Sequence, residues 1–348
     1  MDQLEAAASR VIRSGWYVLG QEVEAFEAEF ANFIGIKHCV GVASGLDALV
    51  LAIEALALPP RSEILVASNT YIATILAIMH AGHKPVLVEP EIKTFNIDPE
   101  LLADVLTDRT RAICVTHLFG KTCRMDAIAA FAYEHGLKLL EDCAQSHGAK
   151  LGQRMTGTFG DTGCFSFYPT KNLGAIGDAG AVVTNNDDLA DRLRYLRNYG
   201  SRQKYINRYV GVNSRLDELQ AAMLRVKLQY LDEVTTHKRA LAEIYFAELP
   251  DWVCMPARRP DEFDVFHIYG IRHPRRDALR KHLLERGVKT EIHYPIPPYR
   301  QEAMQGVFSG DYPIADELHE TQLSLPISVG HRADDIRLVC ERLKSFPS

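Results

Sequence analysis

The sequence predicts an α/β fold in which helices cover both faces of a mostly parallel sheet. Short apolar runs alternate with segments of helical periodicity from about residue 36 to residue 184, a pattern typical of parallel sheets with crossover helices. A chain of 348 residues, 47% hydrophobic and 24% charged, is long enough for a large core and a second lobe. We therefore expect a soluble globular protein with a large domain over residues 1–235 and a small α+β domain over residues 236–348.

Seven strands are expected in the large domain, and together they predict one seven-stranded sheet. Their ranges are 38–43, 63–67, 85–88, 112–116, 137–140, 163–167 and 180–184. Helices are expected between them at 46–56, 72–80, 99–106 and 125–135. The strands are short apolar runs and the helices have apolar residues three or four positions apart.

After residue 184 the pattern becomes mainly helical. Asn186 can cap a helix that runs to Asn198 and is ended by Gly200. A second helical stretch covers 216–249, where apolar residues recur at helix-like spacing. The remaining residues should form a strand and two helices, at 266–271, 276–286 and 334–344.

Charge and cysteine content argue against several classes of protein. The net charge of −6 comes without a basic block, so nucleic acid and anionic membranes are poor partners. Seven cysteines without a C-x-x-C pair argue against a disulfide framework and a structural metal, and they indicate a reducing compartment. The apolar stretches are too short for a membrane span, and the N-terminus lacks an apolar signal core. We therefore expect a cytoplasmic protein with a small-molecule partner.

One lysine and one aspartate suggest a cofactor. Lys171 follows the strand at 163–167 and precedes the glycine-rich stretch 174–180, while Asp142 ends another strand, at the sheet edge where α/β proteins place ligands. A lysine amine can form an imine with the aldehyde of pyridoxal phosphate, and a carboxylate can keep its pyridine nitrogen protonated. Taken alone, Lys171 would be a solvated surface lysine and Asp142 a polar strand end. Together they favour pyridoxal phosphate.

Further residues complete a candidate cofactor site. Gly45 and Leu46 follow a strand and open a helix, so their backbone N–H groups can bind a phosphate, to which Ser166 can add a hydroxyl. Gln145 can bond the ring hydroxyl and Tyr71 can stack on the pyridine. Each has an ordinary alternative, since Gly45 also suits a helix cap, Gln145 a helix start and Tyr71 a core aromatic.

Five motifs, in order along essentially the whole chain, resemble the DegT/DnrJ/StrS-type nucleotide-sugar aminotransferases. They lie at residues 41–49, 141–149, 165–180, 211–222 and 292–298. The resemblance implies a fold-type-I, aspartate-aminotransferase-like homodimer whose active site lies at the subunit interface. It also implies transamination of a nucleotide-linked keto-sugar, with L-glutamate as the amino donor that leaves as 2-oxoglutarate.

The resemblance also implies roles for individual residues. Lys171 is similar to the lysine that bonds the cofactor, and Asp142, Gln145 and Ser166 are similar to the contacts of its pyridine nitrogen, ring hydroxyl and phosphate. Asn213 resembles a phosphate contact donated by the neighbouring subunit. Where many relatives have Thr or Ser, this chain has Leu46, so backbone amides must replace one phosphate hydroxyl.

The substrate residues are expected from the same resemblance. Arg215 resembles a residue that holds an acidic substrate group, and Tyr168, His293 and Tyr294 are expected to face the sugar. By themselves, Asn213 and Arg215 would be a turn asparagine and a surface arginine, and the other three would pack between lobes. Tyr168 stands where many relatives have histidine.

Within the family, the chain most resembles the subgroup that aminates carbon 3 of dTDP-3-keto-6-deoxyhexoses. This resemblance lies in the form of residues 45–49, 198–201 and 293–298. A 4-keto or a UDP-linked sugar is the alternative substrate. The family's dehydratases have histidine where this chain has Lys171, which argues against that branch. A noncatalytic regulator that binds pyridoxal phosphate is the alternative from a different class of protein.

Overall fold

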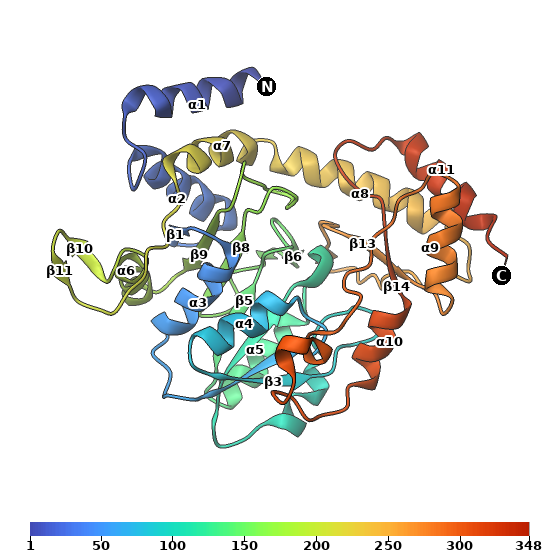
Figure 1. Ribbon diagram of the computed structural model, residues 1–348, viewed down its shortest axis with the longest axis horizontal. Helices are drawn as coiled ribbons and strands as arrows, with labels where there is room; N and C mark the ends of the chain where they lie inside the picture. Colours follow the sequence, from blue (N-terminus) through green and yellow to red (C-terminus); the bar gives the residue numbers. More distant parts are fainter. Residues whose placement is uncertain (348) are drawn as a thin grey trace.

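A seven-stranded sheet forms the centre of the structure, a computed structural model that describes residues 1–347 (Figure 1). Its strands are β1 (His38–Val42), β2 (Glu63–Ala67), β3 (Lys84–Val88), β4 (Thr110–Thr116), β5 (Lys138–Asp142), β8 (Thr162–Ser166) and β9 (Gly180–Thr184). The order is β1-β9-β8-β5-β4-β2-β3, and β9 runs antiparallel to both of its neighbours, whereas the other pairs are parallel. The expected seven-stranded, mostly parallel sheet is confirmed.

Helices cover both faces of the sheet. One face carries α3 (Gly45–Ala55), α4 (Ile72–His80) and α6 (Asp187–Leu196), and the other carries α2 (Gln21–Ile34), α5 (Met125–Glu134) and α7 (Glu218–Leu228). Side chains alternate along a strand, so in β4 Cys114 packs with the first group while Ile113 and Val115 pack with the second. Both faces are therefore apolar, as buried parallel strands require.

The second lobe is built around a small antiparallel sheet of β13 (Tyr269–Arg272) and β14 (Gln322–Leu325). Three helices surround it: α8 (Leu231–Glu248), α9 (Arg276–Glu285) and α11 (Ala333–Lys344). Its apolar core draws its buried residues from Leu241 to Phe346. The domain division near residue 235 stays a prediction, because α8 is continuous through it.

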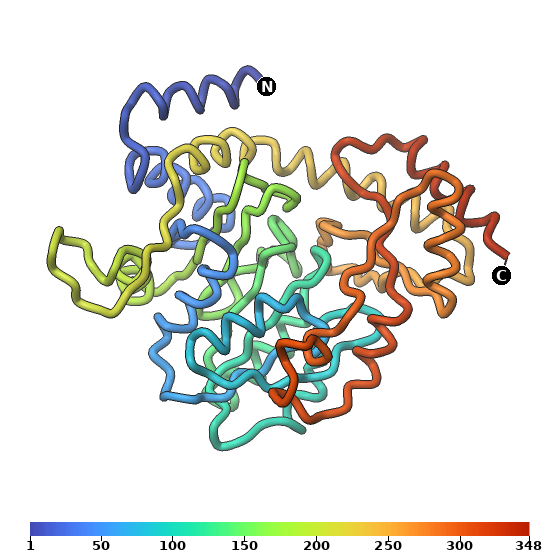
Figure 2. Tube along the Cα trace, in the orientation of Figure 1, coloured from blue at the N-terminus to red at the C-terminus, as the bar shows by residue number. Residues whose placement is uncertain are grey.

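The chain between the two strands of that sheet returns to the large lobe (Figure 2). It contains α10 (Pro313–Thr321), whose first N–H groups, from Ile314 and Ala315, donate to the Glu89 carboxylate at 2.7 and 3.1 Å. Met304 of the same segment lies in the core under α3 and α4. This segment therefore connects the lobes beside the carboxyl end of β3.

Smaller elements complete the fold. They are α1 (Asp2–Ser14), β6 (Lys150–Leu151), β7 (Arg154–Met155), β10 (Ser201–Gln203), β11 (Ile206–Asn207), β12 (Glu262–Phe263) and the 3₁₀ turns η3 (Leu118–Gly120), η4 (Pro298–Arg300) and η5 (Glu302–Met304). The sequence patterns described above gave no indication of α1, α2, α10 or β14. No helix among the described residues is both long and apolar enough to cross a bilayer.

Three expectations about local structure are wrong. The helix expected at 99–106 is two 3₁₀ turns, η1 (Pro99–Leu101) and η2 (Ala103–Val105), because its backbone hydrogen bonds span three residues, from Leu102 to Pro99 and from Leu106 to Ala103. The stretch 216–249 divides into α7 and α8 at Tyr230, whose φ of −107° and ψ of 3° interrupt the helix. The strand expected from residue 266 begins at Tyr269, because Phe266 has a φ of 46°, outside the β region.

Candidate active site

Lys171 lies in the loop between β8 and β9, where the backbone makes a hydrogen-bonded turn. Its backbone N–H donates to the Tyr168 carbonyl at 2.9 Å, and the N–H of Ala175 donates to the Phe167 carbonyl at 2.7 Å. Burial lowers the pKa of the Lys171 amine to about 8, although the charge of Asp142 acts to raise it. A neutral amine, the form that attacks a carbonyl, is therefore accessible near neutral pH.

Asp142 ends β5, and it is 5% exposed between β4 and β8. Its carboxylate accepts from the Thr74 hydroxyl at 2.8 Å and from the Ala144 N–H at 3.1 Å. Burial raises the pKa of this carboxyl, even though both hydrogen bonds and the charge of Lys171 act to lower it. A buried carboxylate of this kind gains from a cation placed against it, so the structure suits a protonated ring nitrogen here.

Thr74 belongs to a hydroxyl cluster that the sequence analysis missed. The Thr70 hydroxyl lies 3.0 Å from that of Thr74 and 2.8 Å from that of Thr116. Thr74 is a polar residue in the first turn of a helix that is otherwise apolar up to His80 at its end, and this feature of the sequence could have drawn attention to it. The cluster orients the hydroxyl that bonds Asp142.

Gln145, Tyr71 and Tyr294 form one connected group. The Gln145 side-chain oxygen accepts from the Phe119 N–H at 2.7 Å, and its amide nitrogen donates to the Tyr294 hydroxyl at 3.1 Å. The rings of Tyr71 and Tyr294 lie 5.0 Å apart at an angle of 37°. Burial raises the pKa of Tyr294, so its phenol stays neutral. The structure thus brings a predicted cofactor residue and a predicted substrate residue into direct contact.

His293, beside Tyr294, is held by β14. Its backbone N–H donates to the Gln322 side-chain oxygen at 2.9 Å, and its Nδ1 lies 2.8 Å from the Ser324 hydroxyl. Burial lowers the pKa of His293, which keeps the imidazole neutral. Tyr168 differs from it, because its ring is 51% exposed and its backbone alone contributes to the turn at Lys171.

The N-terminus of α3 forms a cradle that fits an anion. Ser44 caps the helix by accepting from the Asp47 N–H at 3.1 Å, which leaves Gly45 and Leu46 in the first turn. A Cβ on Gly45 would lie 2.4 Å from the Ser166 Cβ and 2.9 Å from its hydroxyl oxygen. Only glycine therefore lets the helix end meet Ser166 this closely, and the residues suit a bound phosphate.

Asn213 and Arg215 contact another part of the chain. Asn213 is exposed and pairs with Asn198 through the backbone, while the Arg215 guanidinium donates to the Asn198 side-chain oxygen at 3.0 Å. Ser214, between them, donates to the Asp47 carboxylate at 2.7 Å. The segment therefore borders the first turn of α3, and the contact of Asn213 with a phosphate in a neighbouring subunit stays a prediction.

Glu141 precedes Asp142 and faces the opposite side of the sheet. It is fully buried, and it accepts from the N–H groups of Gly157, Phe159 and Gly160 at 2.7–2.8 Å. Glu141 also lies with His117 and Cys143 in a group whose ligand atoms are within 4.8 Å of one another. Because its oxygens are occupied by backbone donors, Glu141 organises the 157–160 loop instead of offering a metal ligand.

His147 is a buried histidine to which the sequence analysis gave no role. Its ring lies 5.5 Å from that of Phe165 and 5.6 Å from that of Phe167. Burial, together with the charge of Lys171, lowers its pKa to about 3, so the ring is neutral. It supports the strand that leads to Lys171.

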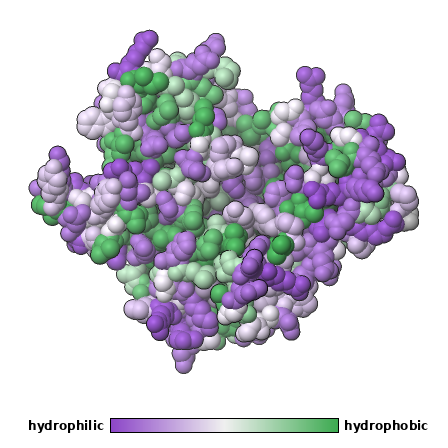
Figure 3. Space-filling model, in the orientation of Figure 1, coloured by the Kyte–Doolittle hydropathy of each residue, from purple (hydrophilic) through white to green (hydrophobic). Residues whose placement is uncertain are grey.

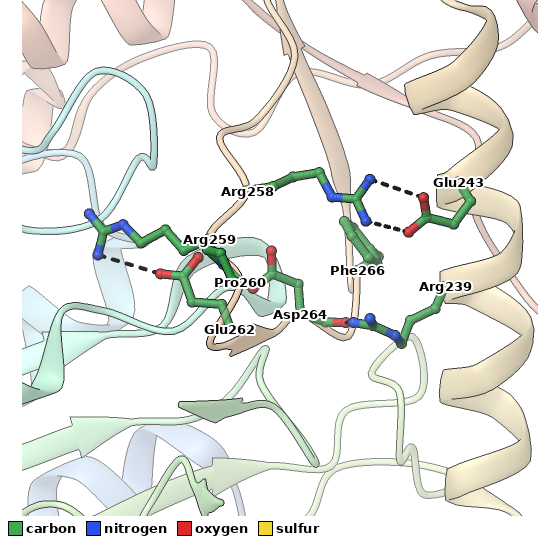
Figure 4. A pocket seen from close by; sticks show the side chains of 8 residues that line it. All are labelled: Arg239, Glu243, Arg258, Arg259, Pro260, Glu262, Asp264 and Phe266. Carbon is green, nitrogen blue, oxygen red and sulfur yellow. Dashed lines mark hydrogen bonds and ion pairs between the residues drawn. The ribbon is translucent and has the colours of Figure 1, made fainter. Parts of the chain in front are cut away.

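A separate cavity of about 310 Å³ lies where α8 meets the 258–266 segment (Figure 4). Arg258 makes two bonds to Glu243, at 3.0 and 2.6 Å, and Arg239 donates to the Asp264 carbonyl at 2.7 Å. Its arginines are therefore engaged by the protein itself. Lys171 is not among the residues that line this cavity.

Comparison with known proteins places the chain among transaminases. Residues 2–344 match the DegT/DnrJ/EryC1/StrS aminotransferase family. The chain is 46% identical over 345 residues to dTDP-3-amino-3,6-dideoxy-alpha-D-galactopyranose transaminase of Aneurinibacillus thermoaerophilus, covering 99% of this chain and 95% of that protein. It is 47% identical over 330 residues to dTDP-3-amino-3,4,6-trideoxy-alpha-D-glucose transaminase of Streptomyces venezuelae, covering 93% and 87% of the two chains.

Solved structures confirm the expected fold class. S. venezuelae DesV in complex with a ketimine intermediate superposes with a TM-score of 0.96 at 44% identity, covering 99% of this chain and 94% of that chain. Bacillus subtilis NtdA with the bound cofactor PMP superposes with a TM-score of 0.90 at 27% identity, covering 99% and 81% of the chains.

Proposed function

Because this chain belongs to the DegT/DnrJ/EryC1/StrS aminotransferase family, we propose that it aminates carbon 3 of a dTDP-linked 3-keto-6-deoxyhexose. L-Glutamate is the proposed amino donor, and it leaves as 2-oxoglutarate. The protein uses pyridoxal phosphate, the cofactor of these aminotransferases. The observation that carries the proposal is the partly buried amine of Lys171, with a pKa of about 8, in the electrostatic field of the buried Asp142.

The residues present fit pyridoxal phosphate at both ends of the molecule. The N-terminus of α3 and Ser166 would hold the phosphate, because Gly45 leaves the space that a side chain would fill. Asp142 would hold the ring nitrogen, which supplies the positive charge that a buried carboxylate lacks. Gln145 and Tyr71 would hold the ring hydroxyl and the ring face.

The chain's own residues divide the chemistry between them. When bound, the cofactor supplies an aldehyde that bonds an amine and a ring that accepts electrons from the substrate carbon. Lys171 would bond that aldehyde through its amine, and once glutamate takes its place the freed amine would carry a proton to and from the reacting carbon. Asp142, as a carboxylate against the ring nitrogen, would keep the ring an electron acceptor. Tyr168, His293 and Tyr294 are proposed to border this space and to orient the sugar.

The choice of carbon 3 and of a dTDP-sugar is supported by the two relatives named above, both of which are dTDP-3-amino-sugar transaminases. We expect the protein, incubated with L-glutamate and a panel of 3-keto and 4-keto dTDP- and UDP-sugars, to convert a 3-keto dTDP-sugar. Mass spectrometry and NMR of the product would identify the aminated carbon. The same panel with Lys171→Ala corrects for nonenzymatic amination. Accumulation of a 4-amino product alone would contradict the proposed ring position.

A homodimer with shared active sites is part of the proposal. Apolar side chains are exposed at several positions, among them Ile12 at 61%, Trp16 at 62% and Tyr71 at 48%. Figure 3 shows hydrophobic patches among the polar residues of one face of the molecule. A second copy of the chain would bury such residues. Tyr71 is itself a proposed cofactor residue, so an interface that covers it would reach the proposed active site.

Complementation between two damaged subunits tests the shared site. If Asn213 serves the partner's phosphate, Asn213→Ala and Lys171→Ala subunits should form a mixed dimer with one intact site. Random pairing then restores about a quarter of the wild-type sites. We expect this activity when the two variants are co-expressed and assayed at limiting pyridoxal phosphate, and not when each is assayed alone. If Asn213 served its own subunit, co-expression would restore nothing.

A further inference from the structure

Side chains from α7 and α8 hold the Lys171 loop at alternate residues. At Ile176, the Gln220 side chain accepts from the backbone N–H at 2.8 Å and donates to the carbonyl at 2.9 Å. At Gly174, the Lys227 amine donates to the carbonyl at 2.6 Å. These contacts attach the glycine-rich part of the loop to α7.

The third contact is at Asn172, next to Lys171. The Lys238 amine, on α8, donates to the Asn172 side-chain oxygen at 2.8 Å and to the His267 carbonyl at 3.3 Å. The Asn172 amide nitrogen in turn donates to the Val265 carbonyl at 2.9 Å. Lys238 is 5% exposed, so this is an interior contact and not a surface lysine in a chance position.

We propose that Lys238 is a positioning residue, which acts through Asn172 to hold Lys171 at the place where its amine must transfer a proton. This inference rests on the proposed function, because it assumes that Lys171 is the catalytic amine. No described contact joins Lys238 to the residues proposed to hold the cofactor, so its effect on the reaction passes through the Asn172 side chain and the peptide bond to Lys171.

The chemistry of the two side chains explains why these residue types are needed. Asn172 must accept from Lys238 on one side and donate to a carbonyl on the other, and an amide does both. Lys238 needs only to donate, so it works as an amine or as an ammonium group. Burial lowers its pKa to about 7, and burial of a lysine is costly unless it is compensated by hydrogen bonds. The two carbonyl-type acceptors provide that compensation.

The contact also connects the loop to the second lobe. Val265 and His267 lie on the segment that enters that lobe, and the Val265 N–H donates to the Gly120 carbonyl at 2.9 Å, beside the Phe119 that bonds Gln145. Through its bond to Val265, Asn172 therefore links the position of Lys171 to the same segment that borders the Gln145 group. Precise placement of a reacting amine is sensitive to such support, since a misplacement of about 1 Å can cost about 10²-fold in rate.

The test compares variants of the holoenzyme in the glutamate half-reaction, followed by the change in cofactor absorbance. We expect Lys238→Met, which keeps an apolar stem and loses the donors, to lower the rate constant by about 10- to 100-fold while KM for glutamate changes by less than about 3-fold. Lys238→Arg, which retains donors, should recover most of the rate. Lys227→Met is the matched control, because it frees the Gly174 carbonyl, which lies in the same loop two residues after Asn172. Its rate constant should stay within about 3-fold of that of the wild type.

Hydrogen exchange gives a readout that does not depend on turnover. In Lys238→Met, peptides covering residues 168–178 should exchange faster than in the wild type, with the rest of the large lobe unchanged. If Lys238→Met fails to fold, Asn172→Ala should show the same pair of effects from a smaller change. The proposal would be overturned if either folded variant had the rate and the exchange of the wild type. It would also be overturned if Lys227→Met lost as much rate as Lys238→Met. If the wild type did not react with glutamate, the proposed function would fail. If the wild type reacted and Lys238→Met showed unchanged exchange at residues 168–178, only the positioning role would be refuted.

Discussion

Lys171→Ala should lose at least about 10⁴-fold in turnover, the largest effect expected of any single substitution in this chain. Positioned proton transfer alone contributes about 10²- to 10⁴-fold, and this substitution also removes the amine that bonds the cofactor. The variant should still bind pyridoxal phosphate noncovalently, because the α3 cradle and Asp142 remain. Steady-state assays with glutamate and the keto-sugar would measure the loss, and absorbance after dialysis would measure the bound cofactor.

Chemical rescue distinguishes this role from a structural one. A small primary amine added to Lys171→Ala can enter the space that the side chain vacates and accept the proton in its place. We expect partial recovery of the half-reaction that rises with the concentration of the neutral amine. Activity close to that of the wild type without added amine would refute the assignment of Lys171 as the catalytic residue.

Asp142→Asn should lower the half-reaction rate by about 10²- to 10³-fold, the cost of removing one electrostatic group from an active site. Asparagine has the same shape, and its amide oxygen can accept from the Ala144 N–H while its nitrogen donates to the Thr74 hydroxyl, so both contacts of the carboxylate are kept. The loss would therefore report charge and not packing. Stopped-flow absorbance measures the rate. Asp142→Glu, which keeps the charge on a longer side chain, should lose less than Asp142→Asn if the charge matters most.

In the cofactor-free protein, Asp142→Asn should raise the stability of the fold, whereas it lowers the reaction rate of the holoenzyme. Burial raises the pKa of Asp142 in the folded state, so folded protein binds this proton more tightly than unfolded protein, and stability falls as pH rises from the unfolded value through the raised one. Above the raised pKa the carboxylate is ionised and costs folding free energy, which Asp142→Asn avoids. Urea unfolding at pH 5 and pH 8 should therefore show the variant gaining on the wild type at the higher pH. A variant less stable than the wild type at pH 8, without cofactor, would contradict this account.

The central sheet could be predicted from sequence because its information is local. Each of the seven strands is an apolar run bounded by turn residues, and Asp142 and Lys171 each lie near the carboxyl end of one of them. Parallel strands bring their carboxyl ends to a single edge, so β5 and β8 could be expected to place the two residues together before any distance was known. Asn186 was recognisable as a cap for the same local reason, and its side chain accepts from the N–H groups of Asp188 and Leu189 at 2.9 and 3.1 Å.

Contacts between distant segments were not predictable in the same way. Thr74 reaches Asp142 across 68 positions and Lys238 reaches Asn172 across 66, and neither pairing follows from a local pattern. The interruption at Tyr230 has a similar origin, because α7 packs on the sheet while α8 continues into the second lobe. Apolar spacing alone does not record that the chain changes partners there.

The neighbouring acids of β5 make this strand sensitive to changes in length. Glu141 anchors a loop and Asp142 faces the ligand edge, and they do so because successive side chains of a strand point to opposite sides. Insertion or deletion of a single residue upstream in β5 would exchange the two faces, turning the anchoring carboxylate toward the cofactor and burying the other without its partners. Natural or engineered variants of this enzyme should therefore tolerate substitutions in β5 far more readily than single-residue indels.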